Sequence, residues 1–172
     1  VVLFVWRVDQ NGRTNFPFNW GWGDHLPWNN GRIYWRYSGN RRTDSLLASN
    51  GETLLTMLEY SITNDTQKAY KNSNVIFDQA PRETRYIGGA FFFPGDSGWG
   101  TQFVPSFTLG EMLVLRGTIT DKERFIYEGY LSHKWGLSNT LPGNHEYKSA
   151  PPRMFDGNNW EPATSFAKLY WT

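Results

Sequence analysis

The stretch that decides the fold is TDKERFIYEGYLSHKWGLSNTLPGNHEYKSAPP, residues 120–152, in which a helix is followed by a stop signal and a proline-rich tail. Thr120 can accept a hydrogen bond from the first turn, and Glu123 can reach back to the backbone nitrogen of Thr120, which is the capping-box pattern. Gly136 suits the left-handed position that ends a helix. We therefore expect a helix of about four turns that ends at Trp135.

The apolar residues of this helix predict which face it buries. Tyr127, Leu131 and Trp135 repeat at a spacing of four, with Ile126 and Tyr130 beside them, so one broad stripe should face a core. We expect Trp135 to be the last large anchor of this stripe. Truncating Trp135 to Ala should then be the most damaging single change in the helix.

Glycine and proline positions predict how the helix is packed and how the chain continues beyond it. Gly129 costs roughly 1 kcal/mol of helix propensity relative to Ala, which suggests that another backbone packs closely there. Pro142, Pro151 and Pro152 forbid further helix. The chain after Gly136 is therefore expected to run extended over the surface.

Residues 127–152, YEGYLSHKWGLSNTLPGNHEYKSAPP, resemble the closing signature of a laminin-G-like, concanavalin A-like jelly-roll family that is common in bacteriophage and environmental sequences. The usual form in that family is an (I)EGYLxxKWGL helix followed by LPxxHPYxxxPP. The chain departs from it at Tyr127, where Ile is usual, and at Glu146, where Pro is usual. The matching residues are Glu128, Gly129, Tyr130, Leu131, Lys134, Trp135, Gly136, Leu137, Leu141, Pro142, His145, Tyr147, Pro151 and Pro152.

Short strands and turns are expected before the helix. Residues 53–62 are apolar on both faces, which indicates a central strand. Asn11-Gly12 is a hairpin signal, and Asn72-Ser73-Asn74 stands where relatives carry a Tyr-x-Asn-Gly hairpin. The expected strands cover residues 1–9, 16–22, 32–37, 53–62, 84–89 and 107–116, with a hairpin over 68–77.

Together with the resemblance, this pattern predicts an all-β fold: an antiparallel β-sandwich of the concanavalin A-like jelly-roll type with one C-terminal amphipathic helix and an extended tail. Residues 1–152 form the jelly-roll domain in this interpretation, and residues 153–172 form a C-terminal tail or hairpin. Val1–Asp9 resembles an interior strand of such a sandwich, so we expect further strands upstream of Val1.

Composition limits the function classes. The chain has 172 residues, with 17 Lys and Arg against 16 Asp and Glu, so no net field attracts nucleic acid or an anionic membrane. Residues 1–9 are apolar for too short a distance to span a bilayer. No cysteine is present, which excludes disulfides and a cysteine nucleophile. We expect neither a nucleic-acid partner nor membrane insertion.

The sequence lacks the residue pattern of an enzyme of this fold class. A jelly-roll glycoside hydrolase needs two carboxylates facing each other across a cleft, and no strand carries the alternating Glu-x-Asp-x-x-Glu pattern. Asp121 and Glu123 are explained by helix capping. His25, His133 and His145 have no metal-site or triad spacing; His133 is expected to be solvated, and His145 to pack or bond to the backbone. We predict no catalytic and no metal-binding residues.

Aromatic side chains are the candidate ligand-binding residues. Trp28 and Trp99 lie in Gly-rich segments, and Phe92 and Asp96 share a long loop, residues 90–106, with Trp99. Three consecutive Phe residues cannot all enter one strand face, so we expect this loop to present an aromatic patch to a glycan or another chain. The alternative is that it covers the edge of the domain's own sandwich. Trp6, Trp35 and Trp135 are assigned to the core.

No cofactor is predicted, with calcium as the alternative that the resemblance leaves open. Laminin-G-like relatives sometimes hold calcium on loop carboxylates. Here Asp24, Asp44, Asp65 and Asp96 are the loop candidates, although isolated Asp residues beside Gly or Asn are usually turn formers.

The resemblance and the missing catalytic pattern lead to three functional hypotheses. The first is a non-catalytic structural module of a phage or phage-like particle, a virion surface, fibre or decoration protein that contacts other virion proteins or copies of itself and can adhere to cell-surface glycan. The second is a carbohydrate-binding module of a secreted or cell-surface bacterial protein. A glycoside hydrolase is the third and least favoured.

Overall fold

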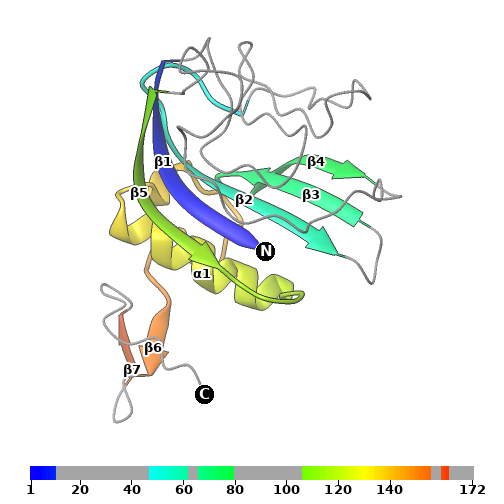
Figure 1. Ribbon diagram of the computed structural model, residues 1–172. Coiled ribbons are helices and arrows are strands. Elements are labelled where there is room, and N and C mark those ends of the chain that lie inside the picture. Colours follow the sequence, from blue (N-terminus) through cyan, green and yellow to red (C-terminus); the bar gives the residue numbers. More distant parts are fainter. Residues whose placement is uncertain (11–46, 62–65, 80–105, 156–159, 163–172) are drawn as a thin grey trace.

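An antiparallel sheet of five strands is the centre of the described fold (Figure 1). The computed structural model describes residues 1–10, 47–61, 66–79, 106–155 and 160–162. The strand order is β4-β3-β2-β1-β5, so the strand predicted to be central, β2, is central. The expected strands at 16–22, 32–37 and 84–89, and Trp35 with them, lie outside the described residues. The strands are β1 Val2–Gln10, β2 Thr53–Ser61, β3 Thr66–Lys71, β4 Asn74–Gln79 and β5 Ser106–Val114.

The helix begins and ends as its capping residues predict. Helix α1 spans Asp121–Lys134. The Glu123 backbone N–H donates to Thr120 Oγ1 at 3.2 Å, and the Thr120 N–H donates to Glu123 Oε2 at 2.7 Å, so both halves of the capping box are present. Gly136 has φ +70°, the left-handed conformation expected after the helix.

The segment after the helix is not an extended run, which corrects the prediction. It forms a short 3-10 helix, η2, Ser138–Thr140, followed by hydrogen-bonded turns. Prolines forbid further helix but permit turns, and turning brings the apolar Leu137 and Leu141 to buried positions. Beyond it, β6 Arg153–Phe155 pairs with β7 Trp160–Pro162 in a separate two-stranded sheet.

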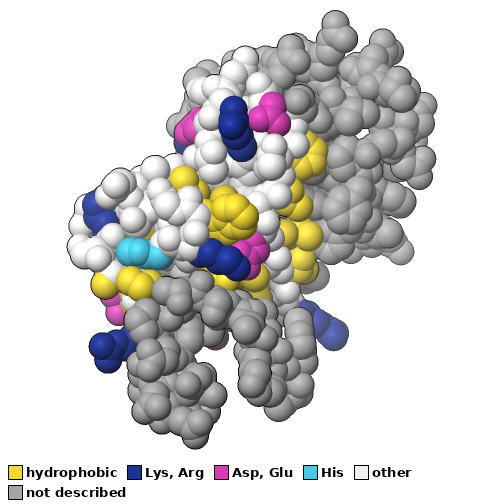
Figure 2. Space-filling view, turned by 90° about the vertical axis from the view of Figure 1, so that its left-hand side faces the viewer, with side chains coloured by type: hydrophobic (Ala, Val, Ile, Leu, Met, Phe, Trp, Pro, Cys, Tyr) yellow, Lys and Arg dark blue, Asp and Glu magenta, His cyan; other side chains and the backbone are white. Residues whose placement is uncertain are grey.

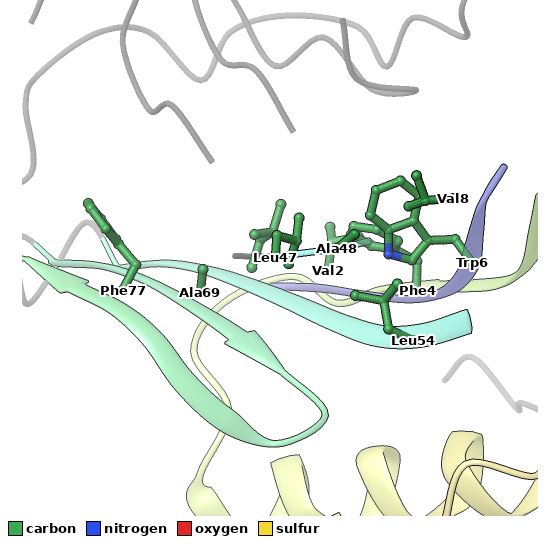
Figure 3. Close-up of a cluster of buried hydrophobic side chains, with 10 residues drawn as sticks. Val2, Phe4, Trp6, Val8, Leu47, Ala48, Leu54, Ala69 and Phe77 are labelled. Carbon is green, nitrogen blue, oxygen red and sulfur yellow. The ribbon is translucent and has the colours of Figure 1, made fainter. Parts of the chain in front are cut away.

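The sheet buries side chains on both faces because successive residues of a strand point to opposite sides. On the face opposite the helix, Phe4 and Trp6 pack with Leu54 (Figure 3). The Trp6 indole N–H donates to Thr56 Oγ1 at 2.9 Å, so the polar atom of this buried ring is satisfied. Trp6 is therefore a core residue, as predicted. Other buried members of this cluster are Val2, Val8, Leu47, Ala48, Leu58, Ala69 and Phe77.

The other face of the sheet packs against α1. Tyr130 and Leu131 of the helix are completely buried there. They share one cluster with Leu3 and Val5 of β1 and with Met57 of β2. The helix therefore depends on the sheet for its stability, since a lone helix of this length is marginal in water.

Trp135 is not the buried anchor that its spacing predicts. It stands at the C-cap of α1 and keeps 40% of its surface exposed. The ring lies against Gly110 of β5, which stands at one end of the order of the five described strands. The stripe is thus anchored by Leu131 and Tyr130, with Tyr127 only half-buried.

Gly129 is a point of close approach between α1 and the following tail. A Cβ at this position would lie 2.5 Å from Tyr147 Cβ and 2.9 Å from Tyr147 Cγ. A close approach occurs at Gly129, as expected, but the side chain of Tyr147 makes it rather than another backbone.

We predict that Gly129→Ala destabilises the protein by about 1–3 kcal/mol through this clash, although Ala is the better helix former. Urea unfolding followed by circular dichroism measures the change. Gly143→Ala is the matched control, because a Cβ there meets nothing within 4 Å. Equal or higher stability of Gly129→Ala would show that Tyr147 does not pack on the helix.

A second prediction concerns the corrected helix face. Leu131→Ala should cost about 2–5 kcal/mol, because it leaves a cavity between α1 and the sheet. Trp135→Ala should cost about half of that or less, since much of its ring is already in water. Comparing the two denaturation midpoints decides between the observed face and the one expected from spacing alone.

Candidate functional site

The ligand-binding residues predicted from sequence, Trp28, Phe92, Asp96 and Trp99, lie outside the described residues. The same holds for the loop candidates for calcium, Asp24, Asp44 and Asp65. The described part of the chain instead contains two polar arrangements that involve α1, one around Glu128 in the middle of the helix and one at its C-terminal end. Sequence reasoning assigned a role to neither.

The first arrangement surrounds a buried carboxylate and is called here the Glu128 cluster, made of Ser73, Arg124, Glu128 and His145. The Glu128 side chain is completely buried. Arg124 Nη1 lies 3.1 and 3.0 Å from its two oxygens. The Ser73 hydroxyl donates to Oε2 at 2.7 Å, and His145 Nε2 lies 3.4 Å from the same atom. Three segments far apart in the sequence therefore meet at one carboxylate.

Ser73 joins the β3–β4 hairpin to this cluster. Asn72 and Ser73 have φ values of +47° and +69°, the left-handed pair that a two-residue hairpin requires. A non-glycine residue there costs roughly 1–2 kcal/mol. The hydroxyl of Ser73 offsets this cost, because a hydrogen bond to a buried charged group is stronger than one between neutral groups.

Arg124 reaches the cluster from the first half of α1. Its guanidinium lies over the rings of Tyr70 and Phe125, 4.8 and 4.4 Å from their centroids. It also contacts Asp121 at 3.3 Å. The aromatic rings therefore cover a guanidinium that is paired with the buried carboxylate of Glu128 and the exposed carboxylate of Asp121.

Tyr70, one of these rings, has a shifted pKa. Burial, with the negative charge of Glu59 as the second cause, raises the pKa of Tyr70 well above its usual range.

His145 connects the tail to the same carboxylate. Its Nδ1 accepts a hydrogen bond from the Tyr147 N–H at 3.1 Å, which leaves the ring proton on Nε2, facing Glu128. Its ring packs against Phe125 with centroids 4.9 Å apart. The prediction of a packing or backbone role for His145 is confirmed. His133, expected to be solvated, is half-buried, and its Nε2 lies 2.8 Å from the Tyr147 carbonyl oxygen.

The Glu128 cluster has the residue types of an acid–base site but not its exposure. Glu128 and His145 are both buried in the protein, whereas a general acid or base must reach a substrate proton. The exposed pair Asp121 and Glu123 belongs to the helix cap. Two hydrogen bonds from Thr120 lower the pKa of Glu123, as expected for a capping carboxylate. The geometry of the Glu128 cluster is that of a structural contact that holds helix, hairpin and tail together.

The second arrangement lies at the C-terminal end of α1 and is called here the Trp135 platform, made of Gly110, Glu111, Lys134 and Trp135. The Trp135 indole N–H donates to Glu111 Oε2 at 3.0 Å, and Lys134 Nζ lies 2.9 Å from the same oxygen. Lys134 Nζ also donates to the Tyr130 hydroxyl at 2.8 Å. Hydrogen bonds to Tyr130 and Glu111 raise the pKa of Lys134. Figure 2 turns this side of the molecule toward the viewer and shows hydrophobic side chains beside basic and acidic groups.

Gly110 is the residue from which a close contact at this platform could have been predicted from the sequence. An isolated Gly inside a strand pattern suggests a bulge or a close approach, and both occur here. The pairing of β1 with β5 shifts register between Val5 and Trp6, whose partners are Glu111 and Leu109. Gly110 is therefore the extra residue of a bulge, and the ring of Trp135 lies on it.

The described ranges contain neither a cluster of metal ligands nor a spanning helix. Within them, no group of three or more His, Asp or Glu side chains is placed to hold a metal ion. Over the same ranges, no helix has the length and apolar character that crossing a membrane requires.

We predict that Glu128→Gln destabilises the protein by about 3–5 kcal/mol, because it removes the buried carboxylate of the ion pair and leaves only the exposed Asp121 carboxylate beside the Arg124 guanidinium. Asp78→Asn is the matched control: it removes the exposed Lys68–Asp78 ion pair, 3.2 Å long, and should change stability by less than about 1 kcal/mol. Chemical denaturation of both variants at neutral pH makes the comparison. Similar small losses for both would mean that water reaches Glu128.

Comparison with known proteins gives no relative for this chain. No protein-family model matches it, and neither the curated proteins nor the solved structures contain a significant match.

Proposed function

We propose that this chain is a non-catalytic jelly-roll module of a virion surface, where it contacts other virion proteins or copies of itself. The observation that carries the proposal is that residues of the closing signature make structural contacts between separate segments. Its residues Glu128, Gly129, His145 and Tyr147 hold helix, hairpin and tail together. A signature whose members interlock in this way favours a building block over a reactive site.

The two buried faces of the sheet support the finer fold assignment. One face is covered by α1, yet Val2, Phe4 and Leu54 on the opposite face are at most 1% exposed. An antiparallel sheet usually leaves one face to solvent unless a second layer packs on it. This burial supports a proposed β-sandwich with the five-stranded sheet as one of its layers, and the proposal of the jelly-roll type rests on the resemblance of the closing signature.

A carbohydrate-binding module of a secreted or cell-surface bacterial protein is the second candidate function. The exposed ring of Trp135 is the observation that favours it, since exposed aromatic faces are common in binding surfaces. The described residues add no support to the glycoside hydrolase hypothesis: Glu128 is completely buried and held by Arg124 and His145, so it does not face a second carboxylate across an open cleft.

Location tests the proposal directly. The virion assignment predicts that peptides of this chain are found by mass spectrometry in particles purified through a density gradient, at a copy number similar to that of other structural proteins. Antibody labelling of intact particles should place it on their surface. Peptides recovered only from the cell envelope or culture medium would instead support the carbohydrate-binding module.

A further inference from the structure

We propose that the Trp135 platform is a glycan-binding site, with the indole face as the stacking surface for a pyranose ring and Glu111 and Lys134 as partners for its hydroxyls. This inference names a ligand class and rests on the adhesive role allowed in the proposed function. It uses an aromatic residue, Trp135, that its spacing had assigned to the core. Three observations carry it.

The first observation is the orientation of the ring. A Cβ built on Gly110 would lie 3.0, 3.1 and 3.1 Å from three consecutive atoms of the six-membered ring of Trp135. Nearly equal distances to three adjacent atoms place Gly110 over a ring face rather than at its edge. One face of the indole therefore rests on the strand. With 40% of the residue exposed, the other face is available to solvent.

The second observation is that the ring is held in place. Its N–H is bonded to Glu111, and Glu111 is in turn bonded to Lys134 and, at 3.3 Å, to the Tyr130 hydroxyl. Tyr130 is completely buried, so it fixes this network to the core. A fixed aromatic surface loses little conformational entropy when a ligand binds, which favours binding over a freely rotating side chain.

The third observation is the polar rim. A carboxylate can accept about four hydrogen bonds and an ammonium group donates three. Among the described residues, the Glu111 carboxylate accepts three hydrogen bonds and the Lys134 ammonium group donates two. The contact between Glu111 and Lys134 is counted once for each residue. Within this part of the chain, one acceptor position and one donor position remain beside the indole, which matches two adjacent sugar hydroxyls.

The charge of the rim selects among ligand classes. Lys134 disfavours a cationic ligand over the ring, and Glu111 neutralises Lys134, which disfavours a phosphate or nucleotide. A neutral ligand with an apolar C–H face and hydroxyl edges fits both conditions. Pairing of a second copy along β5 is disfavoured, since the bulge at Gly110 disrupts the regular ladder that such pairing requires.

Nuclear magnetic resonance of the whole chain tests the site. The protein, labelled with ¹⁵N at its nine tryptophan indoles, is titrated to millimolar concentrations with methyl pyranosides of glucose, galactose, mannose and N-acetylglucosamine and with their soluble oligosaccharides. The Trp135 signal is identified by its loss in Trp135→Phe. We expect it to shift on addition of at least one of these sugars. An unshifted Trp135 signal across the panel overturns the proposal, even if other indole signals move.

Affinity electrophoresis in gels that contain the oligosaccharide identified by the titration, or its polymer, supplies the quantitative arm. Trp135→Ala should weaken retardation by about tenfold or more, the loss expected when one stacked aromatic is removed. Val114→Ala, which truncates an exposed hydrophobic side chain at the end of β5, should leave the retardation unchanged. Unaltered retardation of a folded Trp135→Ala protein would overturn the assignment.

The glycan site and the virion assignment are tested by independent experiments. Mass spectrometry of particles does not depend on sugar binding, so failure of the site and failure of the virion assignment are distinguishable.

Discussion

The buried carboxylate of Glu128 is the constraint on which the arrangement of hairpin, helix and tail depends. Taking one charge out of water costs several kcal/mol even after the protein relaxes. The cost is tolerable only with a counter-charge and filled hydrogen-bond positions, and no single segment supplies these. Arg124 comes from the helix, Ser73 from the hairpin and His145 from the tail. The three segments are therefore required to meet at one place.

This requirement explains local features that would otherwise be unfavourable. Ser73 of the hairpin adopts the left-handed conformation, and its hydroxyl donates a hydrogen bond to the Glu128 carboxylate that offsets the cost. Its neighbour Asn72 secures the same turn to the central strand: its N–H donates to the Leu55 carbonyl oxygen at 2.8 Å, and its side-chain oxygen accepts from the Leu55 N–H at 2.9 Å. The helix accepts glycine at 129 because Tyr147 must pass close to it to carry the tail over the cluster. Buried polar groups of this kind specify one arrangement among many apolar ones.

The two ends of the helix have opposite relations to solvent. Near its first half, charge is hidden under aromatic rings, and the contacts hold segments together. At its last residues, an aromatic ring is held at the surface by a polar network, over a bulge that also interrupts the regular edge of β5. The helix thus joins a buried charged network to a fixed and partly exposed aromatic ring.

The sequence by itself determined the local structure. Thr120, Glu123 and Gly136 specified the helix ends, and Asn72 and Ser73 stand at the hairpin turn. The two-sided apolar pattern of residues 53–62 specified a central strand. All three predictions succeeded because capping, turn geometry and strand alternation depend on residues close in the chain. Only the tertiary structure decided which large side chains were buried. Spacing placed Trp135 on the buried stripe, but burial depends on how far the sheet extends beneath the helix, and the ring lies on Gly110 of β5, at one end of the described strand order. Likewise, Glu128 had no partner in the sequence pattern beyond Arg124, because Ser73 and His145 approach it only when the hairpin and the tail fold onto the helix.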